Sequence, residues 1–177
     1  KEKNIVVSFL GEGTLGEGAS YEAFNLAVLH NTPQLFVCEN NFYSQSTPQV
    51  NSITGNILKR PESFGMRVFE ANTWEIAKLN EIVAQAIEYV RDGSPAFLNI
   101  STYRLNAHSK GDDDRDLDEI QYFHSKDPLN LLLERHEWSK ERDKLEIEIN
   151  KYINNIEESY IDEEFYCKDQ LPRHKKS

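Results

Sequence analysis

The stretch that decides the fold is residues 4–41, NIVVSFLGEGTLGEGASYEAFNLAVLHNTPQLFVCENN. It holds two mostly apolar runs, 5–10 and 35–37, each of which ends in polar residues, and an amphipathic segment lies between them. Such runs are typical of strands covered on both faces of a parallel sheet, and the segment between them is typical of a helix. The stretch therefore predicts a strand, a glycine-rich turn, a helix and a second strand.

The two predicted strands end in short polar signatures, Gly11-Glu12-Gly13 and Glu39-Asn40-Asn41. Open parallel sheets bind ligands at the carboxyl ends of their strands, so this edge is where Glu12 and Asn41 are expected. A carboxylate beside an amide suits a hard cation such as Mg²⁺, with a phosphate next to it. Taken alone, Gly-Glu-Gly also fits a tight turn with one exposed acid, and Asn40-Asn41 fits an ordinary turn. The two signatures together favour the metal–phosphate site.

The alternation of strand and helix signals continues to Tyr103. Apolar spacing predicts helices at 19–30, mostly buried and ended by Asn31, and at 74–91, with strands at 34–39, 66–71 and 95–103. Residues 42–64 contain spaced Pro and Gly and predict a functional loop. We therefore expect an α/β fold with a parallel sheet flanked by helices, followed by a helical C-terminal extension.

From Arg104 the chain becomes polar and acidic, and helical patterns then begin at Asp127-Pro128 and at Ser139. We divide the chain into an α/β domain at 1–105, an active-site loop with a short helix at 106–126, a helical extension at 127–165 and a tail at 166–177. The tail is basic and polar, and we expect it to be disordered. Because Lys1 leads almost directly into a predicted strand, we expect the chain to be part of something larger.

Composition limits the classes of function. The 177 residues carry a formal net charge of −10, which argues against binding to the phosphates of nucleic acids. Apolar runs are all shorter than the roughly 20 residues of a membrane-spanning helix, and we expect no signal peptide. Two cysteines distant in sequence, Cys38 and Cys167, do not predict a disulfide framework or a metal cluster. We expect a cytoplasmic protein that binds neither nucleic acid nor membrane.

Three further features carry possible chemistry. His108 follows a predicted strand; a loop histidine is often merely solvated, but here it can also bind a phosphate or transfer a proton. The acidic run 112–116 lacks the spacing of an EF-hand, and we expect a solvated loop in which Arg115 pairs with neighbouring acids. Cys38 lies in a predicted buried strand and is expected to be chemically inert.

Residues 11–46 resemble the thiamine-diphosphate-binding alpha subunit of two-oxo-acid dehydrogenases, the family of the pyruvate, branched-chain and acetoin dehydrogenase complexes. The family signature begins Gly-Asp-Gly or Gly-Glu-Gly and ends in Asn-Asn, as it does here. Further similar segments are Glu17-Gly18, Pro33, 102–105, His108-Ser109 and 125–128. The resemblance covers most of the chain and implies the thiamine-diphosphate-binding fold.

The resemblance also implies thiamine diphosphate and magnesium as cofactors, and it assigns roles to individual residues. Glu12 and Asn41 match the side-chain ligands of magnesium, and the backbone carbonyl of Tyr43 matches a third ligand. The diphosphate contacts would come from Gly11, Gly13, Thr14, Asn41, Tyr43 and His108. Within this group His108 would be the catalytic residue. Ser109 matches a serine that mitochondrial members phosphorylate.

The function implied by the resemblance is that of one subunit in a hetero-oligomer. The enzyme would decarboxylate a 2-oxo acid and transfer the acyl/enamine fragment to an acceptor. A beta-like subunit would supply the glutamate that activates the cofactor, and a separate chain would supply the N-terminal half that alpha subunits carry before this point. One alternative is a split transketolase-like or acyloin-forming carboligase subunit. Another is a degenerate scaffold, motivated by Gly16, where the family usually has a small polar residue.

Overall fold

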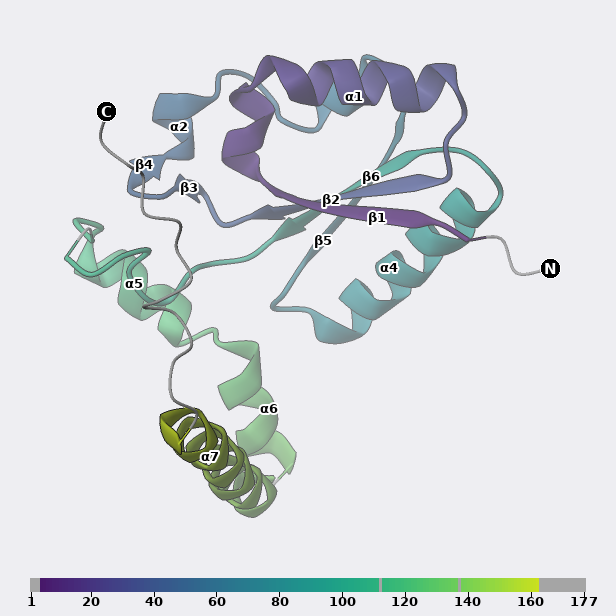
Figure 1. Cartoon of the computed structure of the whole chain (residues 1–177). Helices are drawn as coiled ribbons and strands as arrows, with labels where there is room; N and C mark the ends of the chain where they lie inside the picture. Colours follow the sequence, from purple (N-terminus) through teal and green to yellow (C-terminus); the bar gives the residue numbers. More distant parts are fainter. Residues whose placement is uncertain (1–3, 112, 137, 163–177) are drawn as a thin grey trace, which may run out of the picture. The chain divides into compact units, whose positions relative to one another are not determined.

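The computed structural model describes residues 4–111, 113–136 and 138–162 (Figure 1). The chain divides into two compact units, the first running to Asn130 and the second starting at Leu131. The predicted tail at 166–177 and Cys167 lie outside the described residues.

The first unit is built on a four-stranded parallel sheet with the strand order β1-β2-β6-β5. Each strand lies within two residues of its predicted position: β1 (Val6–Gly11), β2 (Gln34–Asn40), β5 (Arg67–Asn72) and β6 (Ala96–Ser101). The pairing places Gly11 beside Glu39 and Asn40 beside Ser101, so the carboxyl ends of three strands meet at one edge. The predicted α/β class with a parallel sheet is confirmed.

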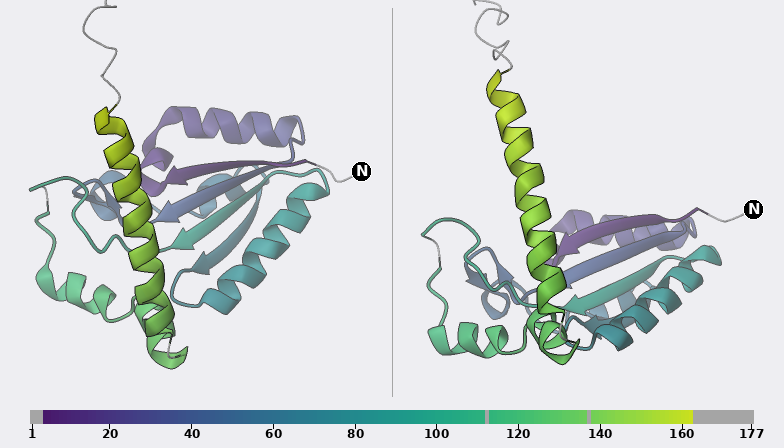
Figure 2. Two further views of the ribbon diagram at one scale, coloured as in Figure 1. Left: turned by 60° about the horizontal axis from the view of Figure 1, so that its bottom comes forward. Right: turned by 90° about the horizontal axis from the view of Figure 1, so that it is seen from below.

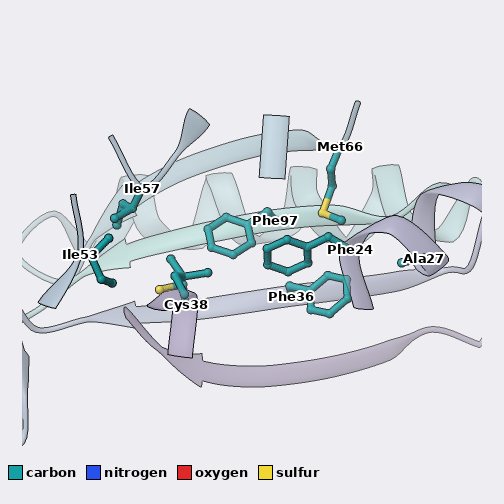
Figure 3. Packing of buried hydrophobic residues seen from close by; sticks show 9 residues of the cluster. Phe24, Ala27, Phe36, Cys38, Ile53, Ile57, Met66 and Phe97 are labelled. Atoms are coloured by element: carbon teal, nitrogen blue, oxygen red, sulfur yellow. The ribbon is translucent and has the colours of Figure 1, made fainter. Parts of the chain in front are cut away.

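Helices α1 (Gly18–Leu29) and α4 (Ile76–Arg91) cover opposite faces of the sheet (Figures 1 and 2). Strand side chains alternate between these faces, because successive residues of a strand point in opposite directions. On the α1 face, Phe24 packs among Phe36, Cys38 and Phe97 (Figure 3). On the α4 face, the buried residues are Leu35, Val37, Phe69, Ala86, Val90, Ala96 and Leu98. The sheet is therefore held between two apolar layers.

The prediction that α1 is mostly buried is wrong. Its buried residues are Ser20, Phe24 and Ala27, which form one stripe, whereas Leu29 is 67% exposed. The apolar residues of this segment lie all round the helix, and only one side of a helix can contact a sheet. The predicted end of the helix is confirmed, because Asn31 adopts a left-handed conformation with φ 47° directly after the C-cap residue, His30.

Strand β1 is an edge strand whose apolar side chains are poorly covered. Val7 and Phe9 pair with Leu35 and Val37, so they point to the α4 face of the sheet. Helix α4 packs on β5, β6 and β2, however, and Phe9 remains 69% exposed. Within the described residues, the sheet therefore presents an open edge with an apolar surface beside it.

Several short elements surround the carboxyl edge of the sheet. The glycine-rich turn after β1 is a 3-10 helix, η1 (Glu12–Gly16). The predicted loop at 42–64 is partly regular and contains β3 (Tyr43–Ser44), β4 (Thr47–Pro48), α2 (Gln49–Ser52) and α3 (Lys59–Glu62). After β6, a loop leads to α5 (Leu117–His124).

The predicted C-terminal helices are present. Helix α6 (Pro128–His136) begins at the predicted Asp127-Pro128, and α7 (Ser139–Asp162) belongs to the second unit. Along α7, Leu145, Ile149, Tyr152 and Ile156 recur at intervals of four and three residues and are exposed. No helix in the described part of the chain is long and apolar enough to span a bilayer.

Candidate metal and cofactor site

Glu12 occupies the junction between β1 and η1, and its carboxylate is buried. The side chain is 1% exposed, so the interpretation of Glu12 as an exposed acid in a turn is wrong. Its Oε2 accepts a hydrogen bond from the backbone N–H of Asn41 at 3.3 Å, whereas Oε1 has no hydrogen-bond partner among the described residues. Burying an unpaired carboxylate oxygen is costly. This oxygen therefore calls for a partner, which a cation would provide.

Asn41 lies in a turn at residues 40–43, the asparagine turn, which two asparagine side chains stabilise. Asn40 Oδ1 accepts from the N–H of Phe42 at 3.1 Å, and Asn41 Oδ1 accepts from the N–H of Tyr43 at 3.0 Å. The residue in the left-handed region is Phe42, with φ 68°, rather than either asparagine. A bulky residue rarely adopts this conformation, which costs about 1–3 kcal/mol. The turn is thus held in one strained shape next to Glu12.

The structure places Glu12 and Asn41 beside each other, as the strand–turn–helix–strand spacing predicts. Within the described residues, no group of three or more His, Cys, Asp or Glu side chains is placed to hold a metal ion. Mg²⁺ does not need such a group, since it often binds one or two carboxylates and completes its shell with other oxygens. One buried carboxylate with an unpaired oxygen and a neighbouring amide therefore fit Mg²⁺.

Gly13 and Thr14 lie in the first turn of η1, where backbone N–H groups lack partners within the helix. A Cβ on Gly13 would lie 2.5 Å from Ser44 Oγ and 2.9 Å from Ser44 Cβ, so a larger residue would collide with β3. A Cβ on Gly11 would meet no atom within 4 Å. The second glycine of the signature is therefore required by packing, whereas the first is not.

Cys38 lies in β2 next to this edge, and its thiol is buried. Burial raises the pKa of Cys38 to about 12, and the nearby carboxylates of Glu12 and Glu39 add to the effect. At neutral pH the group is therefore a thiol, which is a poor nucleophile. The prediction that Cys38 is inert is consistent with this environment.

His108 is exposed in the loop between β6 and α5. In the described part of the chain, no hydrogen bond joins its side chain to Glu12 or Asn41. The fold thus brings Glu12 and Asn41 together through a hydrogen bond, which His108 does not share.

The other end of the same loop is anchored by Arg115. This residue pairs with Asp113 at 2.7 Å, as predicted. The acids at 113, 114 and 116 are exposed, as expected of a solvated loop, whereas Arg115 itself is only 8% exposed. Its guanidinium also donates to the carbonyl oxygens of Arg104 and Asn106 at 2.5 and 3.1 Å. The hydrogen bonds from Arg115 hold the pKa of Asp113 down at about 2. Arg115 therefore joins the end of the loop to its start at residues 104 and 106.

Glu119 of α5 was not identified from the sequence, yet it joins distant segments. Its carboxylate accepts hydrogen bonds from the hydroxyl groups of Tyr43 and Tyr103. The sequence Asp116-Leu117-Asp118-Glu119 has the capping-box pattern that predicts a helix start, and Asp116 does cap α5 through the N–H of Asp118. Nothing in that pattern links residue 119 to residue 43.

A pocket of about 380 Å³ lies at the same edge of the sheet. It is lined by Asn40 and Ser101, the last residues of β2 and β6, and by residues of the segment from α2 to Leu58. The carboxyl edge is thus hollowed beside the asparagine turn, as open parallel sheets commonly are.

Comparison with known proteins identifies relatives over most of the chain. The family described as "Dehydrogenase E1 component" matches residues 1–169. The pyruvate dehydrogenase E1 component subunit alpha of Rickettsia bellii is 37% identical, over 82% of this chain and 47% of the relative. The corresponding Rickettsia felis subunit is 35% identical, with the same coverage of both chains. The chain thus spans about half the length of these relatives.

Among solved structures, transketolase from Campylobacter jejuni is 26% identical, with a TM-score of 0.49 over 56% of this chain and 15% of the transketolase chain. The family match extends over far more of the chain than this structural similarity does. The family match covers the sheet, the asparagine turn, the His108 loop and the C-terminal helices. The chain belongs to the family of dehydrogenase E1 components.

Proposed function

We propose that this chain is the thiamine-diphosphate- and magnesium-binding part of an enzyme that decarboxylates a 2-oxo acid and transfers the resulting acyl fragment to an acceptor. The proposal is supported by the family, whose relatives include pyruvate dehydrogenase E1 alpha subunits. The observation that carries it is the buried Glu12 carboxylate, which has one unpaired oxygen beside the asparagine turn.

The residues present fit a magnesium–diphosphate group. Glu12 would supply a carboxylate oxygen, Asn41 its amide oxygen and Tyr43 its backbone carbonyl. Gly13 and Thr14 would offer N–H groups to the diphosphate, with Gly11 completing the turn. Because the diphosphate brings negative charge, one carboxylate and two neutral oxygens are a suitable set of protein ligands for the metal.

When bound, thiamine diphosphate would supply a carbon nucleophile for addition to the 2-oxo acid and would accept the electron pair left on the substrate fragment when carbon dioxide departs. The chain's own contribution is to anchor and orient the cofactor through the Glu12–Asn41 edge. His108, exposed in its loop, would donate a hydrogen bond to the diphosphate or hold a proton near the substrate. The strained turn at Phe42 would keep the ligand oxygens in place before the metal binds.

We further infer that the active enzyme is a hetero-oligomer. A beta-like subunit would supply the glutamate that activates the cofactor, and additional polypeptide corresponding to the N-terminal half of an alpha subunit would pack beside this chain. The uncovered apolar surface at Val7 and Phe9 on β1 supports the second part of this proposal. The acidic net charge is compatible with an enzyme that binds no nucleic acid.

The test is calorimetric titration of thiamine diphosphate into the chain assembled with its partner subunits, with and without Mg²⁺. We expect saturable binding that requires Mg²⁺ and is lost with EDTA. Release of carbon dioxide from pyruvate and from branched-chain 2-oxo acids would then define the substrate class. If the assembled complex binds no cofactor, the chain is a scaffold and the proposed function is wrong.

A further inference from the structure

A single carboxylate, that of Glu119, connects two segments on either side of the candidate site. Its Oε2 accepts from the Tyr43 hydroxyl at 2.9 Å, and its Oε1 accepts from the Tyr103 hydroxyl at 2.9 Å. Tyr43 begins β3 directly after the asparagine turn, and Tyr103 follows β6 at the start of the His108 loop. Helix α5, which carries Glu119, lies beyond the far end of that loop.

Aromatic rings pack around the segment of α5 that carries this half-buried carboxylate. The ring of Phe123, one turn further along α5, stacks on Tyr103 with a centroid separation of 3.9 Å and an angle of 11°. Phe123 also contacts Trp74 and Phe42, with centroids 5.5 and 6.4 Å away. Helix α5 is therefore fixed to the end of the sheet by packing, and the position of Glu119 is defined independently of its hydrogen bonds.

Arg115 lies beside the cluster formed by Glu119, Phe123 and the two tyrosines. Its guanidinium lies 5.6 Å from the centroid of the Tyr43 ring and 5.1 Å from that of Tyr103, while it pairs with Asp113. A second connection runs outside the cluster, where Arg104 donates to the carbonyl oxygen of Gln45 at 2.8 Å. Both ends of the His108 loop are thus tied to the segment that follows Asn41.

We propose that Glu119 is a positioning residue that fixes the asparagine turn and the His108 loop in one relative arrangement. Through Tyr43 it acts on the turn that carries Asn41, and through Tyr103 it acts on the base of the loop that carries His108. The part of the proposal that concerns metal binding rests on the proposed function. The part that concerns the loop depends only on contacts within this chain.

The proposal predicts effects on two separate properties. Loss of the Glu119 carboxylate should open the loop, so trypsin should cleave after the buried Arg115 several times faster. It should also weaken Mg²⁺ binding about 10-fold or more, as the loss of groups that orient metal ligands commonly does. Global stability should change little by comparison, because Phe123 still packs on Tyr103.

The experiment uses the full chain in its assembled complex and compares three variants, Glu119→Gln, Tyr43→Phe and Tyr103→Phe. Glu88→Gln, which removes an exposed carboxylate on α4, is the matched control. Cleavage after Arg115 is followed by mass spectrometry, Mg²⁺ affinity is measured with thiamine diphosphate present, and thermal unfolding tests the fold. We expect Tyr103→Phe to act mainly on cleavage and Tyr43→Phe mainly on Mg²⁺ affinity, with Glu119→Gln affecting both.

The outcomes are distinguishable. If the variants match Glu88→Gln in both measurements, or if only their unfolding temperature falls, Glu119 has no positioning role. If the wild-type complex binds no cofactor, the proposed function fails, and the cleavage measurement alone decides whether Glu119 holds the loop. The proposal is supported if Glu119→Gln changes both cleavage and Mg²⁺ affinity, each tyrosine variant changes mainly its own property, and Glu88→Gln changes neither.

Discussion

At the scale of single residues, Glu12 combines two opposite effects. Its carboxylate is buried with one oxygen unpaired, which is unfavourable in the absence of a cation, and the same oxygen is the best candidate for binding one. Among the described residues, the only other buried side-chain N or O atom without a hydrogen-bond partner is Asn99 Oδ1, which belongs to a neutral amide. The unpaired carboxylate of Glu12 thus lowers the free energy of unfolding, and a bound metal ion would raise it again.

We predict that Glu12→Gln separates these effects. Without metal, the variant should be as stable as the wild type or more stable by about 1–3 kcal/mol, because a neutral amide is less costly to bury than an unpaired carboxylate. With Mg²⁺ and thiamine diphosphate, the wild type should gain stability and the variant should not. Thermal unfolding of the assembled protein with and without both cofactors measures this.

Three further variants complete this series. Glu12→Ala and Asn41→Ala should weaken cofactor binding strongly, whereas Glu12→Asp should retain part of it, because Asp keeps the carboxylate on a shorter arm. Unchanged Mg²⁺-dependent binding in Glu12→Ala would show that the ligand assignment is wrong.

At the scale of elements, the sequence predicts the strands well and the contacts between loops poorly. Strands β1, β2, β5 and β6 are apolar runs with clear ends, so their positions follow from local pattern. The sequence does not predict the burial of α1 correctly. Leu26 and Leu29 are apolar and look like core residues, but they lie on the side of the helix that faces away from the sheet and are exposed. The pairing of Glu119 with Tyr43, 76 residues away, depends on tertiary packing that no local pattern encodes.

The contact between η1 and β3 gives a prediction at this scale. A side chain on Gly13 would meet Ser44 at 2.5 Å, so Gly13→Ala should destabilise the protein by about 1–3 kcal/mol, as overpacking commonly does. Gly11→Ala is the control, because its Cβ would point into open space. Denaturant unfolding gives the stabilities. Adding Ser44→Gly to Gly13→Ala should recover part of the loss, and no recovery would indicate that the collision is not the cause.

At the scale of the whole molecule, the parallel sheet is unevenly covered. Parallel sheets are normally buried on both faces, yet among the described residues β1 has no strand beyond its outer edge, and Phe9 is exposed. Exposed apolar edge strands are sites where other chains pair. The carboxyl end of the same strand carries Glu12, so whatever covers β1 would also lie next to the candidate metal site. Loss of assembly at β1 should therefore also weaken the binding of thiamine diphosphate and Mg²⁺.

The last prediction tests this link with Phe9→Glu, which places a charge on the exposed surface of β1. Because Phe9 is largely exposed, the variant should fold with an unchanged unfolding temperature, but it should fail to assemble with the partner subunits when they are co-expressed. Light scattering coupled to size-exclusion chromatography measures the mass of the assembly. Val50→Glu, which also replaces an exposed apolar residue but lies in α2, should assemble normally. If Phe9→Glu assembles as the wild type does, β1 is not the interface. If it fails to assemble but still binds thiamine diphosphate and Mg²⁺ with full affinity, the candidate site is complete without the partner and the link is wrong.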